Sequence, residues 1–283
     1  MIRFSNSRGQ SIEFKEGCQF RIFNIDGVGG SDVDVQLQSA PYQDGATHID
    51  SILEPRSISI EFGIFANNKK EIYELRRYIS EVFNPKFGIG TLFLNYGGVS
   101  FEIEATAESG PNFPGGSTNE TSRFQRGMLS LICPNPYWKS EQITEAPTFE
   151  ALFEFPFEGA FEMGIQRDLR TIINDGDAPT PIQIEFYGPA TNPIVINNTT
   201  GEFIKVNQRL QEGEYMRIDT TPGDKSVFFV SPDGTERNVF NWIDLESTFF
   251  LLQIGENEIE YSADSDIQGA IFNIYYSKQY VGV

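Results

Sequence analysis

Apolar positions in the first half of the chain recur at every second residue over several short runs. Such alternation buries one face of a strand and leaves the other in solvent. The run at residues 33–37 alternates Val and Leu with Asp and Gln, so a half-buried strand is predicted there. Strands are also predicted at residues 2–4, 11–14, 20–25, 56–65, 90–96, 99–107 and 124–133.

One segment has helical spacing instead. Asn68 is followed three residues later by Glu71, the signature of a capping box, and Asn84-Pro85 provides a stop. The apolar stripe between them comprises Ile72, Leu75, Ile79, Val82 and Phe83. The pattern predicts a helix at about residues 68–83 that packs on a sheet.

Polar segments rich in chain breakers separate these runs. Asp26-Gly-Val-Gly-Gly30 is not followed by a helix, so it predicts a turn that ends a strand rather than a phosphate loop. Residues 40–50 form a polar arm. Residues 108–121 form a long polar loop, predicted to be either mobile or ordered only by a neighbour.

The second half repeats the β pattern with no helical spacing between its runs. Strands are predicted at residues 171–174, 182–187, 194–197, 203–206, 215–219, 226–230, 249–254, 256–261 and 270–276. Short strands at this regular spacing indicate a β-sandwich. The predicted fold is mostly β, with β-sandwich domains and one principal helix.

Composition and charge indicate two domains. The chain has 283 residues, with 25 Phe, 11 Tyr, 26 Gly and 15 Pro, which favours sheets joined by tight turns. Residues 1–135 have a net charge of −4 and residues 136–283 a net charge of −15. The segment Cys133-Pro-Asn-Pro-Tyr-Trp138 interrupts the strands, so domains at 1–135 and 136–283 are predicted. The near-neutral first half is the better candidate for self-association.

The total charge of −19 argues against nucleic-acid binding and against adsorption to anionic membranes. The excess of acid serves solubility or, alternatively, matches a basic partner. The N-terminus has no apolar core of signal-peptide length, and no later stretch is long enough to span a membrane. Neither nucleic-acid binding nor membrane insertion is therefore predicted.

The inventory of reactive residues is poor. His48 is the one histidine and has no nucleophile motif around it, while Cys18 and Cys133 lack metal-ligand spacing and are expected to be reduced. Asp175 and Asp177 lack EF-hand spacing. No catalytic, cofactor or metal site is predicted, and the protein is not expected to be an enzyme.

Two aromatic features leave alternatives open. The segment from Glu145 to Glu162 pairs Glu with Phe repeatedly, as an interdomain segment or as a strip that binds a sugar or partner. Trp138 and Trp242 are either core or interface anchors or carbohydrate platforms. Trp242 is the candidate for a carbohydrate or partner contact.

The order of these elements resembles the distal tail protein (Dit) family of siphophages that infect Gram-positive bacteria, and of related prophages and tail-like bacteriocins. The resemblance covers nearly the whole chain. The stretches that carry it are Phe23-Asn-Ile-Asp-Gly27, Leu53-Glu-Pro-Arg-Ser-Ile58, the strand leading into the helix at Lys69 to Phe83, Cys133 to Trp138, Thr171 to Asp177, and Gly255-Glu-Asn-Glu-Ile259.

The resemblance implies a structural component of the phage tail tip or baseplate. In this family an N-terminal sandwich with a helix and an extended hairpin forms a hexameric ring. The ring joins the major tail tube protein to the tail-associated lysin or fibre hub, with a receptor-binding protein as a further candidate partner. A C-terminal galectin-like sandwich projects outward. The expected location is the virion tail tip, after synthesis in the bacterial host cytoplasm, and no cofactor is implied.

The arm, taken as residues 40–55, and the loop at residues 108–121 suggest the ring interface. The candidate residues for this interface are Tyr42, Asp44, His48, Leu53 and Arg56. Two rival functions remain at this point: a carbohydrate-binding adhesion module that uses Trp242, and a glycoside hydrolase that uses the abundant carboxylates.

Overall fold

The computed structural model describes residues 1–145, 168–265 and 272–283. The chain forms two compact units. Unit 1 comprises Met1–Glu141 together with Tyr280–Val283, and unit 2 comprises Gln142–Gln279. The division into domains at residues 1–135 and 136–283 stays a prediction about which parts fold and act separately.

Unit 1 is built on one long antiparallel sheet in which one strand, β8, pairs with different neighbours along its length. The order of the sheet is β2-β1-β7-β8-β9-β6-β3, and β10 pairs with β8. The residues of β8 up to Ala105 pair with β7, while Thr106 and Ala107 pair with β9. The bounds are β1 (Ile2–Ser5), β2 (Ser11–Phe14), β3 (Phe20–Asp26), β6 (Arg56–Phe65), β7 (Gly90–Tyr96), β8 (Val99–Ala107), β9 (Phe124–Cys133) and β10 (Trp138–Ser140). The chain returns to this unit through β23 (Gln279–Tyr280).

The core of unit 1 follows from the alternation in sequence. In β6, Ile58, Ile60, Phe62 and Ile64 are all buried, whereas Ser59 and Glu61 between them are exposed or half-buried. The helix α1 (Lys69–Val82) packs on β6 and β2. It begins at Asn68, whose side chain accepts a hydrogen bond of 3.0 Å from the Glu71 amide, as the capping pattern predicts. A short 3₁₀ turn, η1 (Pro85–Phe87), follows the helix.

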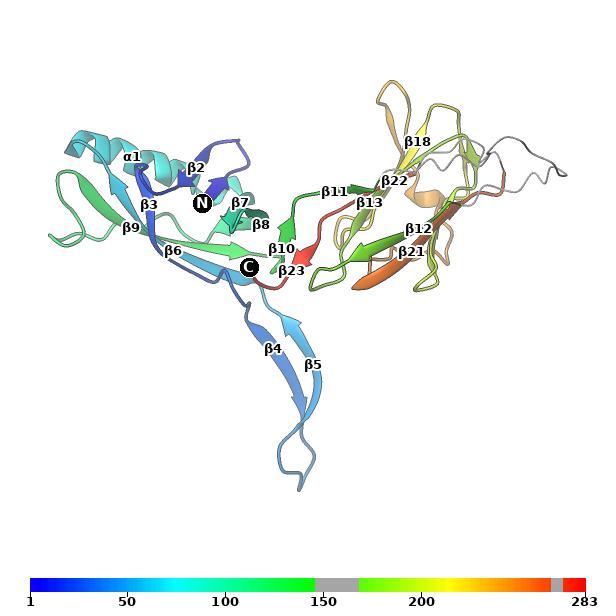
Figure 1. Ribbon diagram of the computed structural model, residues 1–283, viewed down its shortest axis with the longest axis horizontal. Helices are drawn as coiled ribbons and strands as arrows, with labels where there is room; N and C mark the ends of the chain where they lie inside the picture. The colour runs from blue at the N-terminus through cyan, green and yellow to red at the C-terminus, as the bar shows by residue number, and fades with distance from the viewer. Residues whose placement is uncertain (146–167, 266–271) are drawn as a thin grey trace. The chain divides into compact units, whose positions relative to one another are not determined.

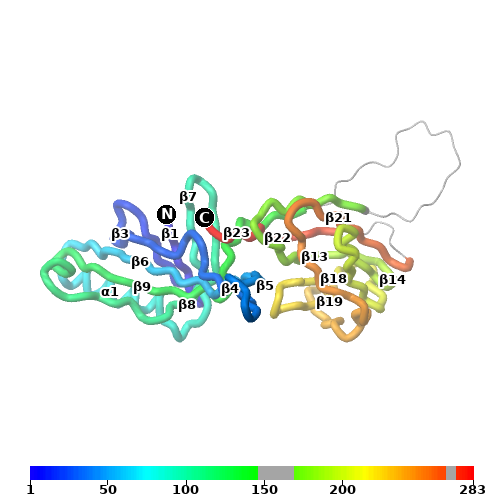
Figure 2. Tube along the Cα trace, turned by 90° about the horizontal axis from the view of Figure 1, so that it is seen from below, coloured from blue at the N-terminus to red at the C-terminus, as the bar shows by residue number. Residues whose placement is uncertain are grey.

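A hairpin of two strands, β4 (Val33–Gln38) and β5 (Thr47–Leu53), leaves the sheet between β3 and β6. Figure 1 shows it extending away from the sheet of its own unit, and in the view of Figure 2 it lies almost end-on. Every residue from 32 to 52 is exposed. The prediction of a half-buried strand at residues 33–37 is therefore wrong, because no layer of unit 1 covers either face of the hairpin.

The loop at residues 108–121 is held by its own unit. Asn112 exchanges two backbone hydrogen bonds of 2.9 Å with Met128 in β9. The buried Gln125 side chain donates to the carbonyl oxygens of Pro114 and Asn119. These bonds correct the expectation that only a neighbour orders the loop.

Unit 2 is a sandwich of two antiparallel sheets, visible in Figure 1 as β12 and β21 apart from β13, β18 and β22. Its core contains Ile184, Phe186, Ile218 and Phe272. One sheet has the order β11 (Ile143–Glu145), β22 (Phe272–Tyr276), β13 (Ile182–Tyr187), β18 (Tyr215–Asp219), β19 (Ser226–Val230), β20 (Glu236–Asn238). The other has the order β12 (Asp168–Asn174), β21 (Gly255–Ser262), β15 (Ile194–Asn197), β16 (Glu202–Lys205). The small elements are β14 (Ala190–Thr191), β17 (Arg209–Leu210) and η2 (Phe240–Trp242).

One predicted strand of unit 2 is wrong. Residues 249–254 form an irregular segment in which only Leu252 makes a bridge, to Thr180. The Asn174 side-chain amide also donates to the Leu252 carbonyl at 3.1 Å. The segment is therefore held by one bridge and by side-chain bonds rather than by a ladder. The Glu- and Phe-rich run beyond Glu145 lies outside the described residues.

Candidate assembly site

The base of the hairpin is a turn whose carbonyl groups converge. β3 ends at Asp26, as the glycine-rich turn predicts, and Gly27 follows with a φ of +85°. A Cβ atom at Gly27 would lie 2.0 Å from the Ser57 carbonyl oxygen, so no other residue fits without a shift of the backbone. The turn from Gly27 to Gly30 is thereby pressed against the first residues of β6.

Arg56, the first residue of β6, binds this turn. It is only 1% exposed, and its guanidinium donates to carbonyl oxygens of Gly27 at 2.7 Å and Gly29 at 2.6 Å. Longer bonds of 3.3 Å reach Val28 and Gly30, and Nε donates to Pro136 at 2.8 Å. The other terminal nitrogen donates to the Val281 carbonyl. One side chain thus joins the hairpin turn, the segment after β9 and the end of the chain.

The electrostatics around Arg56 are unusual for a buried charge. Burial lowers the pKa of the guanidinium, and no carboxylate among the described residues pairs with it. Carbonyl dipoles take the place of a counter-ion, which satisfies the donors of a buried charged group. Burial also raises the pKa of the neighbouring Cys133 thiol to about 11, so this thiol stays protonated at neutral pH.

Trp138 completes the base of the hairpin. It is fully buried, and its indole Nε1 donates to the Val28 carbonyl at 3.0 Å. Trp138 is therefore a core anchor and not a carbohydrate platform. With Arg56 it fixes both ends of the turn from which β4 emerges.

The hairpin presents an apolar face without a covering layer. Directly opposite residues share a face of an antiparallel pair, and Val33 lies opposite Leu53, Val35 opposite Ser51, and Leu37 opposite His48. Val33, Val35 and Leu37 are 43%, 48% and 60% exposed. A two-stranded hairpin alone is marginally stable in water, so this face favours a partner.

The structure places four of the five predicted interface residues on this hairpin. Tyr42, at the tip, is fully exposed with a φ of +66°, and Asp44 lies beside it. His48 Nε2 is 2.7 Å from the Ser51 hydroxyl, and Leu53 is half-buried at the base. Arg56 differs, because its side chain is buried and bound within one protomer.

Trp242 lies in unit 2, in η2, where its ring is 38% exposed. The Arg237 guanidinium carbon lies 5.6 Å from the ring centroid.

Two features of the hairpin were not predicted from the sequence. One is that Val33, Val35 and Leu37 are exposed, and the other is the set of backbone carbonyl groups that bind Arg56. The charge of the hairpin was an available signal in the sequence, since residues 31–55 contain five Asp or Glu and no Lys or Arg.

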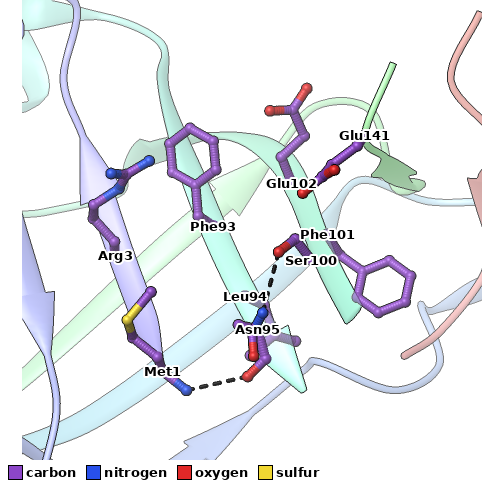
Figure 3. A pocket seen from close by; sticks show the side chains of 9 residues that line it. All are labelled: Met1, Arg3, Phe93, Leu94, Asn95, Ser100, Phe101, Glu102 and Glu141. Atoms are coloured by element: carbon purple, nitrogen blue, oxygen red, sulfur yellow. Dashed lines mark hydrogen bonds between the residues drawn. The ribbon is translucent and has the colours of Figure 1, made fainter. Parts of the chain in front are cut away.

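A shallow pocket of about 250 Å³ lies elsewhere in unit 1, across β1, β7 and β8 (Figure 3). The Arg3 guanidinium stacks on the Phe93 ring, 4.4 Å from its centroid. The Met1 amine donates to the Asn95 carbonyl at 3.1 Å. The residues that line this pocket include no histidine or cysteine. Among the described residues no helix is long and apolar enough to cross a membrane, and no three His, Cys, Asp or Glu side chains form a metal-binding group.

Two family models match the chain, one in each unit. Residues 7–133 match the phage tail protein RIFT-related domain, and residues 175–280 match the C-terminal domain of the siphovirus-type tail component. The chain belongs to the siphophage distal tail protein family. It is accordingly a structural component of the phage tail or baseplate and not an enzyme. No curated protein matches the chain.

Solved structures have the same mostly-β fold as this distal tail protein. The crystal structure of SPP1 Dit (gp 19.1), described as a paradigm of the hub adsorption apparatus in Gram-positive infecting phages, matches with a TM-score of 0.68 and 12% identity over 99% of both chains. A chain of the phage P2 baseplate in its activated conformation with Ca matches with a TM-score of 0.60 and 10% identity, covering 100% of this chain and 99% of that one. The p2 baseplate with Sr gives a TM-score of 0.57 and 10% identity, over 97% and 98%.

Proposed function

We propose that this distal tail protein forms a closed ring of identical copies, a hexamer, at the phage tail tip. The observation that carries the proposal is the β4–β5 hairpin, exposed from residue 32 to residue 52 with an apolar face. Each copy extends its hairpin to the next, so the contact is heterologous and closes into a ring when the rotation permits. Tyr42, Asp44, His48 and Leu53 lie in this contact.

The ring joins the tail tube protein to the tail-associated lysin or fibre hub, with a receptor-binding protein as a further partner. The similarity to SPP1 Dit, a paradigm of the hub adsorption apparatus in Gram-positive infecting phages, supports such a position. Unit 1 builds the ring, and the acidic residues 136–283 face outward into solvent. The ring assembles in the host cytoplasm and remains in the virion.

The test compares the full chain with a variant in which residues 32–54 are replaced by a short Gly-Ser turn. Native mass spectrometry and negative-stain imaging of the full chain should give rings, and the shortened variant should be monomeric with unit 2 still folded. The control Tyr73→Ser, at an exposed position on α1, keeps the hairpin and should assemble. A full chain that stays monomeric at high concentration, alone and with tail proteins, contradicts the proposal.

A second candidate function is carbohydrate binding by unit 2. The exposed indole of Trp242 beside Arg237 is the observation that favours it, since aromatic faces stack on sugar rings. Pull-down on purified cell wall with the wild type and Trp242→Ala tests it. Binding that Trp242→Ala abolishes would support an adhesion role, and absence of binding by the wild type would reject it.

A further inference from the structure

Three phenylalanine rings form an aromatic patch on the outer face of the unit 1 sheet. They are Phe23 from β3, Phe65 from β6 and Phe124 from β9, with ring centroids 5.2 to 6.3 Å apart. Phe23 is 47% exposed. Gly63 lies beneath them, and a Cβ atom there would be 2.5 Å from the Phe23 ring. The missing side chain at Gly63 lets the rings close over the sheet, with Phe23 exposed and Phe65 and Phe124 half-buried.

Basic residues border this aromatic patch. The Arg21 guanidinium lies 4.3 Å from the Phe65 ring centroid, and the Arg126 guanidinium lies 5.8 Å from that of Phe23. Arg126 also pairs with Glu61. A hollow of about 650 Å³ adjoins the patch, and its lining includes Phe23 and Phe65, the basic Lys15 and Arg21, and one acidic residue, Glu16. The surface therefore suits a ligand that is apolar in part and negatively charged in part.

The β4–β5 hairpin has the complementary character. Its apolar face carries Val33, Val35 and Leu37, and residues 31–55 include Asp32, Asp34, Asp44, Asp50 and Glu54 with no Lys or Arg. Exposed apolar surfaces that are rimmed by charge mark protein interaction sites. The chain thus carries an acidic apolar strand pair and an arginine-bordered aromatic patch, both uncovered.

A hairpin cannot cover the aromatic patch of its own copy. Arg56 begins β6 at the base of the hairpin, whereas Phe65 ends β6, and β6 spans Arg56–Phe65. At about 3.3 Å per residue, the two ends lie roughly 30 Å apart. Figure 1 shows the hairpin leaving at the opposite end of β6 from α1 and pointing away from the sheet.

We infer that the aromatic patch of each copy receives the β4–β5 hairpin of a neighbouring copy. The inference rests on the proposed ring and names its acceptor surface. Aliphatic side chains of the hairpin pack on Phe23, Phe65 and Phe124, and the negative charge of the hairpin favours its approach to a surface bordered by Arg21 and Arg126. Because donor and acceptor are different surfaces of one chain, each copy has one free hairpin and one free patch until the ring closes.

Site-specific photo-crosslinking locates the acceptor directly. A benzoyl-phenylalanine placed at Leu37 in the full chain should crosslink between copies to peptides that contain residues 21–23, 65 or 123–128, as mapped by mass spectrometry. The same group at Tyr73, which is exposed on α1, is the control and should not reach them. Crosslinks from position 37 that map only to other surfaces of the chain, or only to another tail protein, overturn the inference.

Variants of the aromatic patch give an independent measure. Phe23→Ser should weaken self-association at least about tenfold, and the control Tyr73→Ser less than about twofold. Arg21→Glu, which removes no core side chain, should weaken association strongly at about 0.05 M salt and less at about 0.5 M, because salt screens the repulsion. Melting curves of each variant verify that unit 1 remains folded.

The two proposals fail in different ways. If shortening the hairpin abolishes rings while Phe23→Ser and Arg21→Glu both assemble as the wild type does, the acceptor is wrong and the ring proposal stands. If rings persist without the hairpin, the proposed function itself fails. Loss of assembly in the patch variants together with the predicted crosslinks supports both.

Discussion

Unit 1 and unit 2 are both antiparallel β structures, yet they differ in how many large apolar side chains they leave exposed to solvent. Unit 2 closes two sheets over one core and leaves few large apolar side chains exposed. Most exposed large apolar residues of the described chain lie in unit 1, on the hairpin and on outer sheet faces. The near-neutral residues 1–135, with a net charge of −4, also repel a second copy less than residues 136–283 do, with −15. The difference supports the proposal that unit 1, rather than unit 2, makes the contacts between copies.

The largest expected effect is the loss of stability of unit 2 when a side chain of its core is truncated. It tests whether ring assembly depends on unit 1 alone. Phe186 is fully buried and packs edge-on against Tyr261 at 5.4 Å and Phe272 at 6.4 Å. Phe186→Ala should cost about 4 kcal/mol of unfolding free energy in unit 2. Differential scanning calorimetry should show unit 2 melting earlier while rings still form. Loss of rings in this variant at temperatures where unit 1 is folded would contradict the assignment of assembly to unit 1.

The next effect concerns Arg56, whose buried side chain binds the carbonyl groups of the turn at the base of the hairpin. Arg56→Met leaves the carbonyl groups of the turn without donors, so unit 1 should lose about 3 kcal/mol. The exposed Arg77→Met on α1 is the matched control and should change stability by less than about 0.5 kcal/mol. Urea unfolding followed by Trp138 fluorescence measures both. A similar midpoint for both variants would show that Arg56 does not hold the turn.

Two glycines with similar backbone angles test the close contact at the hairpin base. Gly27 has a φ of +85° and a Cβ atom there would meet the Ser57 carbonyl, whereas Gly9 has a φ of +78° and open space around it. Gly9→Ala should cost about 1 kcal/mol for the left-handed backbone alone. Gly27→Ala should cost about 3 kcal/mol, because overpacking is added to that strain. Equal losses in thermal unfolding would remove the steric argument.

The smallest effect is a difference in alkaline stability. Burial raises the pKa of Cys133 in unit 1 to about 11 from 9.0, so the folded state keeps a proton that the unfolded state loses. This contribution is full below pH 9 and is lost as the pH rises to 11. Cys133→Ala should flatten the pH dependence of unit 1 over that window, and Cys18→Ala, at an exposed position, should not.

The corresponding group in unit 2 titrates later. Burial, together with the hydrogen bond to Glu185, raises the pKa of Tyr187 from 10.0 to about 12. By the same sign, unit 2 should lose stability between pH 10 and 12, and Tyr187→Phe should reduce that loss. Tyr275, which also donates to Glu185, leaves part of the slope in place. Thermal unfolding curves that resolve the two units, recorded across this pH range, would show which unit loses stability first as the pH rises. A loss of stability in unit 2 at lower pH than in unit 1 would contradict the expectation.

The predicted elements agree with the structure where they depend only on residues close in sequence, as strand alternation and helix capping do. Strands such as Arg56–Phe65 and Gly90–Tyr96 match the predicted alternation, and α1 begins at the predicted cap. The segment 249–254 was predicted wrongly because its backbone bonds go to side chains and a single bridge. Alternation in the sequence does not predict burial, as Val33, Val35 and Leu37 show. It indicates which side chains share a face of a strand but not whether another layer covers that face.

By itself the sequence determined the strand periods, the capped helix and the turns, since each depends on neighbours along the chain. It also pointed to the tail family through the order of weak motifs. Only the tertiary structure decided that the hairpin stands uncovered, that Arg56 is a buried clamp and that Phe23, Phe65 and Phe124 meet on one face. These outcomes depend on strands far apart in sequence, whose pairing and packing no local pattern specifies.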